Sequence, residues 1–195
     1  YTAMHGVGTE TLLQVFQKAG LPPPILVDAQ AYPDPDFPTV AFPNPEEPGA
    51  IDLALETARA CDADLVIAND PDADRCAAAV NDPVKGGRML RGDELGAIFG
   101  EIIARQSKNG TLANSIVSST ILSKIAEHYN LEFKQTLTGF KWLSKIDELT
   151  FGYEEAIGYA VDSDSVNDKD GISAALLLAQ IASDLKSKGL TLLDL

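Results

Sequence analysis

An α/β fold is predicted by the way in which helical and strand-like segments alternate along this chain. Residues 10–19 carry apolar side chains at helical spacing, and residues 65–68 form a short apolar run that is typical of a buried strand. The same alternation resumes after residues 81–87, a stretch that is dense in turn-forming residues. We therefore predict two α/β domains, residues 1–87 and residues 88–195.

The first half is predicted to hold helices and short strands on either side of one long loop. Gly20 favours a helix C-terminus, and the prolines at 22–24 cannot continue a helix. Prolines recur between residues 32 and 49, but aromatic residues occur there too, so we expect an ordered loop that packs on the core. The predicted elements are a strand end at 1–4, a helix at 10–19, a strand at 25–27, a helix at 50–61 and strands at 65–68 and 76–80.

The second half repeats this kind of pattern with longer helices. Its last predicted helix is amphipathic, and Asp168 and Asp170 lie near the helix N-terminus, where acidic side chains are favoured. The predicted elements are a helix at 93–106, a strand at 115–118, a helix at 121–129, a strand at 133–137, a strand end at 151–155 and a helix at 172–186.

The charge and the cysteines of the chain limit its partners and its setting. The chain has 15 Lys and Arg against 29 Asp and Glu, a formal net charge of −14, which argues against nucleic acid or an anionic membrane surface as a partner. No apolar run approaches the ~20 residues of a membrane span. Cys61 and Cys76 lack metal-ligand or redox spacing, so we expect two small buried thiols in a reducing cytoplasm. The chain starts within a strand pattern and without Met, so we expect it to be cut from a longer protein.

The most informative segment of the sequence is the acidic loop that ends at Arg75. It holds three carboxylates at alternate positions, Asp70, Asp72 and Asp74, and strand-like runs lie directly before and after it. Three carboxylates so close together repel one another unless a cation neutralises them. Mg²⁺ prefers oxygen ligands and keeps open positions for phosphate. The Arg75 guanidinium could then bind a phosphate oxygen beside the metal.

The residues of this loop bear on three other interpretations. The first is a solvated acidic turn, which needs no ligand and remains an alternative. A calcium EF-hand would need glycine at Arg75 and glutamate at Asn81, so the sequence excludes it. A phosphatase with Asp70 as nucleophile would need a D-x-D-x-T/V run, whereas Asp74 and Arg75 stand at that point.

Five further motifs surround the acidic loop and extend over essentially the whole chain. They are H-G-V-G at 5–8, F-P-N-P-E at 42–46, T-G-F-K-W at 138–142, E-E-A-I-G at 154–158 and D-K-D-G at 168–171. In this order they resemble the motifs of the α-D-phosphohexomutases, the phosphoglucomutase/phosphomannomutase family. The acidic loop itself is similar to the D-x-D-x-D-R magnesium loop of that family.

The resemblance implies two related three-layer α/β/α domains with mixed sheets, the second and third of four. It implies a Mg²⁺-dependent enzyme that interconverts sugar 1-phosphate and sugar 6-phosphate through a phosphoserine and a bisphosphate intermediate. It also implies the roles of the site residues: Mg²⁺ binding by Asp70, Asp72 and Asp74, catalysis by Arg75 at the phosphoserine and by Lys169 as a proton acceptor, and binding of the phosphorylated sugar by Thr138, Gly139 and Glu154. Lys141, which stands between two aromatic residues, is a further candidate for binding the ligand.

The chain also departs from the family pattern. In the sugar loop Tyr153 replaces the usual glycine and Ala156 replaces the usual serine. The resulting E-E-A-I-G loop is similar to that of the branch with phosphopentomutase-like enzymes. The family's phosphoserine loop and distal phosphate-binding loop do not occur in the sequence, so we expect both on missing flanking domains and expect the fragment to be inactive alone. The alternatives are a phosphopentomutase of the same family and a non-catalytic module that binds sugar phosphate.

Overall fold

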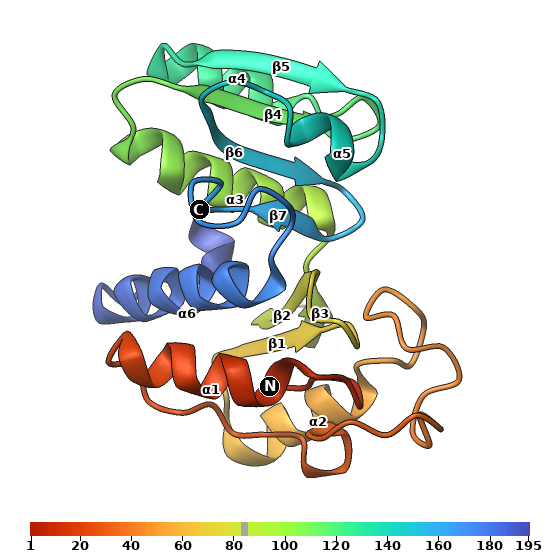
Figure 1. Cartoon of the computed structure of the whole chain (residues 1–195). Helices are drawn as coiled ribbons and strands as arrows, with labels where there is room; N and C mark the ends of the chain where they lie inside the picture. Colours follow the sequence, from red (N-terminus) through yellow and green to blue (C-terminus); the bar gives the residue numbers. More distant parts are fainter. Residues whose placement is uncertain (83–85) are drawn as a thin grey trace.

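A computed structural model describes residues 1–82 and 86–195 of the chain as two β-sheets with helices around and between them (Figure 1). The first sheet has the strand order β1-β2-β3 with antiparallel neighbours. Its strands are β1 (Leu65–Asn69), β2 (Cys76–Asp82) and β3 (Gly86–Met89). Thr2 makes a parallel bridge to Ala68, so the first residues of the chain lie against β1.

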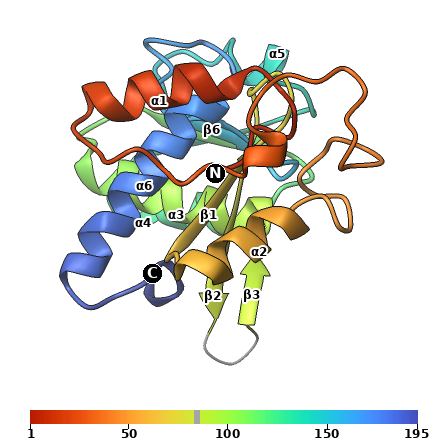
Figure 2. The ribbon, with the colours of Figure 1, turned by 90° about the horizontal axis from the view of Figure 1, so that it is seen from below.

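Two helices of the first half flank this sheet, α1 (Gly8–Lys18) and α2 (Asp52–Cys61). Helix α2 packs against β1, as the view from below shows (Figure 2). A short helix η1 (Asp28–Gln30) precedes the proline-rich stretch. All of residues 32–49 are described, and they contain no helix or strand, as the sequence predicts. The expected packing of their aromatic side chains on the core is wrong for Tyr32 and Phe42, which are exposed (64% and 63%), while Phe37 is half-buried.

The second sheet is mixed and has the strand order β5-β4-β6-β7. Strands β4 (Thr111–Ser115), β5 (Glu132–Thr136) and β6 (Leu149–Glu154) are parallel, and β7 (Gly158–Ala160) is antiparallel to β6. The C-terminal ends of the parallel strands therefore meet at one edge, where α/β folds bind ligands. Its helices are α3 (Gly92–Gln106), α4 (Ile121–Tyr129) and the short α5 (Phe140–Leu143).

Helix α6 (Gly171–Ser187) lies between the two sheets (Figure 1). It contacts α1, β1 and β2 on one side and β7 on the other. Its N-terminus is capped by Asp170, whose carboxylate accepts the N–H groups of Ile172 (3.0 Å) and Ser173 (3.3 Å). After it the chain ends in η2 (Leu192–Asp194). Buried side chains of both halves belong to one hydrophobic cluster, so the two sheets share a core.

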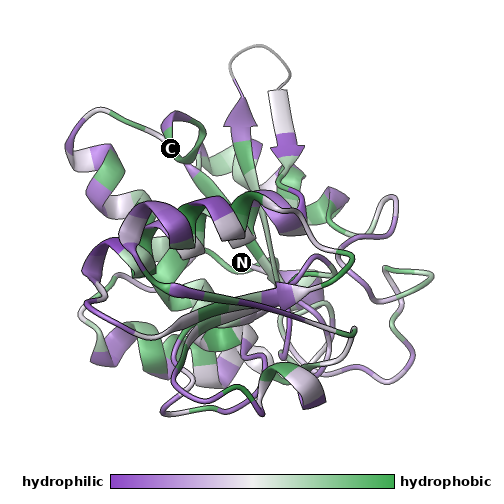
Figure 3. Cartoon of the chain, turned by 90° about the horizontal axis from the view of Figure 1, so that it is seen from above, coloured by the Kyte–Doolittle hydropathy of each residue, from purple (hydrophilic) through white to green (hydrophobic). Residues whose placement is uncertain are grey.

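Helix α1 illustrates how the apolar pattern produces this packing. Leu12 and Phe16 are four residues apart and both are buried, while Glu10 and Gln17 are exposed on the other face. The hydropathy colouring shows hydrophobic and hydrophilic residues mixed along the helices (Figure 3). None of the helices within residues 1–82 and 86–195 is long and apolar enough to cross a membrane.

The structure corrects two predicted strands. The strand expected at 115–118 lies earlier, at β4, and Ile116 and Val117 are exposed in the loop that follows it (61% and 60%). Their apolar side chains imitate a strand pattern but do not enter the core. Residues 25–27 form no strand, although all three are described; the Val27 N–H donates to the Tyr1 carbonyl (2.8 Å).

Cysteine burial and the short elements also differ in part from expectation. Cys76 is buried as predicted, but Cys61 is exposed because it ends α2 on the solvent side. The sequence pattern missed β3, β7 and α5. These elements have three or four residues each, too few to show a period.

The predicted domain division at residue 87 stays a prediction. Of the turn-forming stretch 81–87, residues 83–85 lie outside the described residues. Val80 and Arg88 are partners in the pairing of β2 with β3, so the first sheet continues to Met89. The first sheet therefore extends two residues beyond the predicted division.

Candidate functional site

The acidic loop, residues 70–75, joins the antiparallel strands β1 and β2. One carboxylate oxygen from each of Asp70, Asp72 and Asp74 lies within 4.8 Å of the other two. Asp70 is buried, Asp74 is half-buried and Asp72 is exposed, so the cluster opens to solvent on one side. The loop is tight because Ala73 adopts a left-handed backbone conformation with a φ of +59°.

Arg75 holds the buried carboxylate of this loop. Its backbone N–H donates to Asp70 Oδ1 (3.0 Å) and its side-chain Nε to Asp70 Oδ2 (2.6 Å). Arg75 Nε also lies 3.7 Å from Asp74 Oδ1. Burial raises the pKa of Asp70, although its hydrogen bonds and charge contact with Arg75 act in the opposite direction. The guanidinium therefore helps to keep the buried carboxylate ionised.

Two glycines allow the rest of the chain to approach the acidic loop closely. A Cβ on Gly6 would collide with the backbone of Pro71, and a Cβ on Gly171 with the carbonyl of Ala73. Two backbone hydrogen bonds use this space: Val7 N–H donates to the Pro71 carbonyl (2.8 Å), and Gly171 N–H to the Ala73 carbonyl (3.1 Å). The H-G-V-G and D-K-D-G motifs thus brace the loop from two sides.

Lys169 connects the acidic loop to the second sheet. Its Nζ lies 2.5 Å from Asp74 Oδ2 and 5.9 Å from the centroid of the Phe140 ring. Its aliphatic stem passes close to Gly158, where a Cβ would lie 2.9 Å from Lys169 Cδ. Burial, the largest single influence, acts to lower the pKa of Lys169, but the hydrogen bond to Asp74 and the charges of Asp74, Asp168 and Asp72 together outweigh it and raise the pKa. The lysine is therefore charged at neutral pH.

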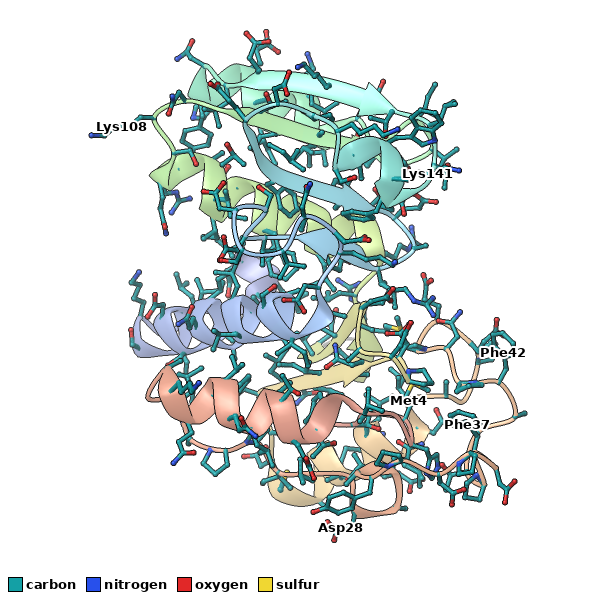
Figure 4. The ribbon with its side chains drawn as sticks, viewed as in Figure 1. Met4, Asp28, Phe37, Phe42, Lys108 and Lys141 are labelled. Atoms are coloured by element: carbon teal, nitrogen blue, oxygen red, sulfur yellow. The ribbon has the colours of Figure 1, made fainter. Side chains whose placement is uncertain are left out.

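The predicted sugar-binding residues lie at the C-terminal edge of the second sheet. Glu154 ends β6, and its Oε1 accepts a hydrogen bond from the Gly139 N–H in the loop that follows β5. Thr138 is exposed beside Gly139. Lys141 Nζ lies 5.7 Å from the centroid of the Trp142 ring, and Figure 4 shows Lys141 on α5, at the side toward which β6 points in Figure 1. The structure thus brings Glu154 and Gly139 together, with Lys141 on the adjoining helix.

A backbone hydrogen bond links the two regions. The N–H of Cys76, the residue directly after the acidic loop, donates to the carbonyl of Ile157 in the turn between β6 and β7 (3.0 Å). Together with the Lys169–Asp74 ion pair, this bond makes the acidic loop and the sugar loop one connected region.

The donor set of the acidic loop fits a hard divalent cation. All three groups are carboxylates, the ligand type that Mg²⁺ and Ca²⁺ prefer, and their oxygens already converge. The buried position of Asp70 beside two further acids makes a neutralising cation favourable.

Sequence reasoning missed the partners of the second glutamate of the E-E-A-I-G motif. Glu155 Oε2 accepts hydrogen bonds from the hydroxyls of Ser115 (2.9 Å) and Ser118 (2.8 Å). The available signal was the pair of serines at the end of a strand, which the misplaced strand at 115–118 concealed.

Two family models match this chain, and together they span nearly all of it. Residues 1–86 match the model described as phosphoglucomutase/phosphomannomutase, alpha/beta/alpha domain II, and residues 91–195 match domain III of the same family. The chain belongs to the phosphoglucomutase/phosphomannomutase family. The resemblance drawn from the motifs, including the two middle domains, is thereby confirmed.

Relatives with different names share high identity with the chain. The probable phosphomannomutase of Haemophilus influenzae is 52% identical over 196 residues, which cover 100% of this chain and 40% of the relative. The phosphopentomutase of Mus musculus is 42% identical over 211 residues, which cover 98% of this chain and 34% of the relative. The chain therefore spans well under half the length of these two family members.

Solved structures of the family share the fold at low sequence identity. A phosphoglucomutase/phosphomannomutase family protein from Burkholderia thailandensis superposes with a TM-score of 0.80 at 19% identity, over 94% of this chain and 39% of that one. The N-acetylphosphoglucosamine mutase of Aspergillus fumigatus, solved in complex with GlcNAc-6P and magnesium, gives a TM-score of 0.63 at 17% identity, over 97% of this chain and 46% of that one. The predicted α/β fold is confirmed by this likeness.

Proposed function

We propose that the full-length protein containing this chain is a Mg²⁺-dependent phosphosugar mutase that interconverts sugar 1-phosphate and sugar 6-phosphate. The observation that supports this most is the joining of the acidic loop to the sugar loop, through the ion pair of Lys169 with Asp74 and the bond of Cys76 to Ile157. A transferring phosphoryl group needs a metal and a positioned sugar in one region. The phosphoserine and a second phosphate-binding loop would come from flanking domains, since the chain spans only part of its relatives.

Each proposed role follows from the chemistry of the side chain. Asp70, Asp72 and Asp74 would hold Mg²⁺, which when bound supplies positive charge to the transferring phosphoryl group. Arg75, already ordered by Asp70, would bind the phosphoserine. The sugar phosphate would be bound by Thr138, Gly139, Lys141 and Glu154.

Glu154 would orient the sugar through its hydroxyls, on which phosphoryl transfer depends for geometry. Its carboxylate has four lone-pair positions, and the Gly139 N–H uses only one of them, so acceptor capacity remains for sugar hydroxyls. The sugar must bind in two orientations, with a bisphosphate intermediate turning over between the two transfers.

The raised pKa of Lys169 bears on its proposed role as proton acceptor. A general base works best with a pKa near the operating pH, whereas the ion pair with Asp74 moves this pKa away from neutrality. In the arrangement seen, Lys169 is better suited to contribute positive charge. It could accept a proton only after its pairing with Asp74 is loosened.

The proposal is tested by two substitutions in the full-length protein. Asp72→Asn should lower kcat/KM for glucose 1-phosphate by at least about a hundredfold, and Glu154→Gln by about tenfold to a hundredfold, because metal charge and sugar positioning are lost separately. Glu10→Gln, an exposed glutamate on α1, is the matched control and should leave kcat/KM unchanged. Near-normal turnover in the Asp72 variant would show that the acidic loop takes no part in the reaction.

A phosphopentomutase is the second candidate. It is favoured by the 42% identity to the mouse phosphopentomutase and by Ala156, which offers no hydroxyl to a hexose. Comparing kcat/KM for ribose 1-phosphate with that for glucose and mannose 1-phosphates decides between the two.

A further inference from the structure

The side chain of Glu155 is fixed by a small network of serines. Its Oε2 accepts hydrogen bonds from the hydroxyls of Ser115 (2.9 Å) and Ser118 (2.8 Å), and these two hydroxyl oxygens lie 2.8 Å apart. The Glu155 N–H donates to Ser118 Oγ (3.1 Å). Both serines are buried, so loss of the carboxylate would leave at least one of the two buried hydroxyls without an acceptor.

Glu154 and Glu155 are thereby attached to different loops. The carboxylate of Glu154 bonds to Gly139, after β5, whereas that of Glu155 bonds to Ser115 and Ser118, after β4. Neighbouring residues at a strand end point to opposite sides, which explains how one of two adjacent glutamates is left for the sugar. The anchoring of Glu155 fixes the backbone from which Glu154 extends.

The turn that carries both residues adopts an unfavourable backbone conformation. Ile157 is β-branched and fully buried, yet its φ is +56°, which for such a side chain is an outlier. The Glu155 carbonyl also comes so close to Gly92 that no Cβ would fit there. A conformation of this kind persists only where the surroundings hold it, and such sites are often functional.

We propose that Glu155 is a positioning residue, which holds the turn at 154–158 so that the Glu154 carboxylate is presented to the sugar. This inference rests on the proposed function for the role of Glu154. It assigns Glu155 no contact with the substrate. Its effect passes through the serines and the backbone to its neighbour.

The test compares variants of the full-length protein by sugar-phosphate kinetics and by calorimetric titration of Mg²⁺. Glu155→Ala should raise the KM for glucose 1-phosphate by about tenfold to a hundredfold, the size of effect expected from a misplaced binding group. Glu155→Gln should restore KM to within about threefold of the wild type, because its amide oxygen still accepts from the serine hydroxyls. Ser118→Ala removes the hydroxyl that donates to Glu155 Oε2 and accepts from the Glu155 N–H, and its KM should lie between those of the two Glu155 variants. Mg²⁺ affinity should stay unchanged in all three variants, because the acidic loop is also held by Arg75 and by the backbone hydrogen bonds from Val7 and Gly171.

Glu101→Ala is the control for a loss of stability alone. The Glu101 carboxylate also accepts two hydrogen bonds, from the Tyr129 hydroxyl (2.7 Å) and from Arg105 (2.8 Å), but it lies on α3 away from the turn. The inference is overturned if Glu155→Ala keeps a normal KM, or if Glu101→Ala raises KM as much. A wild-type protein that neither converts nor binds sugar phosphates would instead overturn the proposed function, and this inference with it.

Discussion

At the scale of single residues, Lys169 and a metal ion compete for the same carboxylate. Lys169 Nζ lies 2.5 Å from Asp74 Oδ2, and Asp74 is one of the three groups of the proposed metal site. An ammonium group at this distance neutralises part of the negative charge that attracts a cation. The lysine stabilises the acidic loop without metal and weakens its attraction for metal.

We therefore expect Lys169→Met to bind Mg²⁺ more tightly than the wild type, by about threefold to tenfold, since the screened charge of one lysine is worth ~1 kcal/mol. Calorimetric titration with Mg²⁺ alone measures this without substrate. Lys141→Met is the matched control, because Lys141 is exposed and lies over Trp142. Equal or weaker binding in the Lys169 variant would contradict the competition.

Ala156 sets a second residue-scale expectation, which concerns the choice of sugar. It is exposed in the sugar loop next to Glu155 and brings no hydroxyl to a substrate. Ala156→Ser should shift the ratio of kcat/KM values toward glucose 1-phosphate over ribose 1-phosphate by up to about tenfold, which corresponds to one hydrogen bond of ~1 kcal/mol. The ratio is measured for both sugars in both forms. A wild type that already selects one hexose by several orders of magnitude would exclude this role for Ala156.

At the scale of elements, the acidic loop could be predicted while its surroundings could not. The apolar runs of β1 and β2 are local, so the loop between them was found with its carboxylates. The bracing of Pro71 by Gly6 joins residues that are far apart in sequence, and no local pattern encodes it. The strand before Ser118 was misplaced for a related reason: exposed Ile116 and Val117 look apolar in sequence, and only tertiary packing decides burial.

Gly6 provides the test at this scale. Gly6→Ala should destabilise the protein by about 1–3 kcal/mol, since the added Cβ collides with the backbone of Pro71, which cannot rotate away as a side chain can. The variant should also bind Mg²⁺ more weakly, because the acidic loop must shift. Gly87→Ala is the control: among residues 1–82 and 86–195, its Cβ would meet only Leu55 Cδ2, at 3.4 Å. Denaturant unfolding measures the loss of stability, and calorimetry measures the Mg²⁺ affinity. An unchanged Mg²⁺ affinity would show that Gly6 does not support the metal site.

At the scale of the whole molecule, two sheets share one core through α6. The helix contacts β1 and β2 on one side and β7 on the other, and its buried residues join side chains of both sheets in one cluster. The family match assigns the two halves to two domains, each with its own sheet. Their packing nevertheless predicts that they do not unfold independently, because each sheet loses part of its cover when α6 leaves.

Leu178, fully buried on α6, makes this expectation measurable. Leu178→Ala should lower the free energy of unfolding by about 2–5 kcal/mol, the usual cost of a cavity at a fully buried leucine. If the core is shared, amide hydrogen exchange in β1 and in β6 should speed up by the same factor, since both strands then open in one transition. A large change in one sheet with none in the other would show that the sheets unfold separately. Leu137→Ala serves as the control, because Leu137 is exposed (63%) and its loss should leave exchange in both strands unaltered.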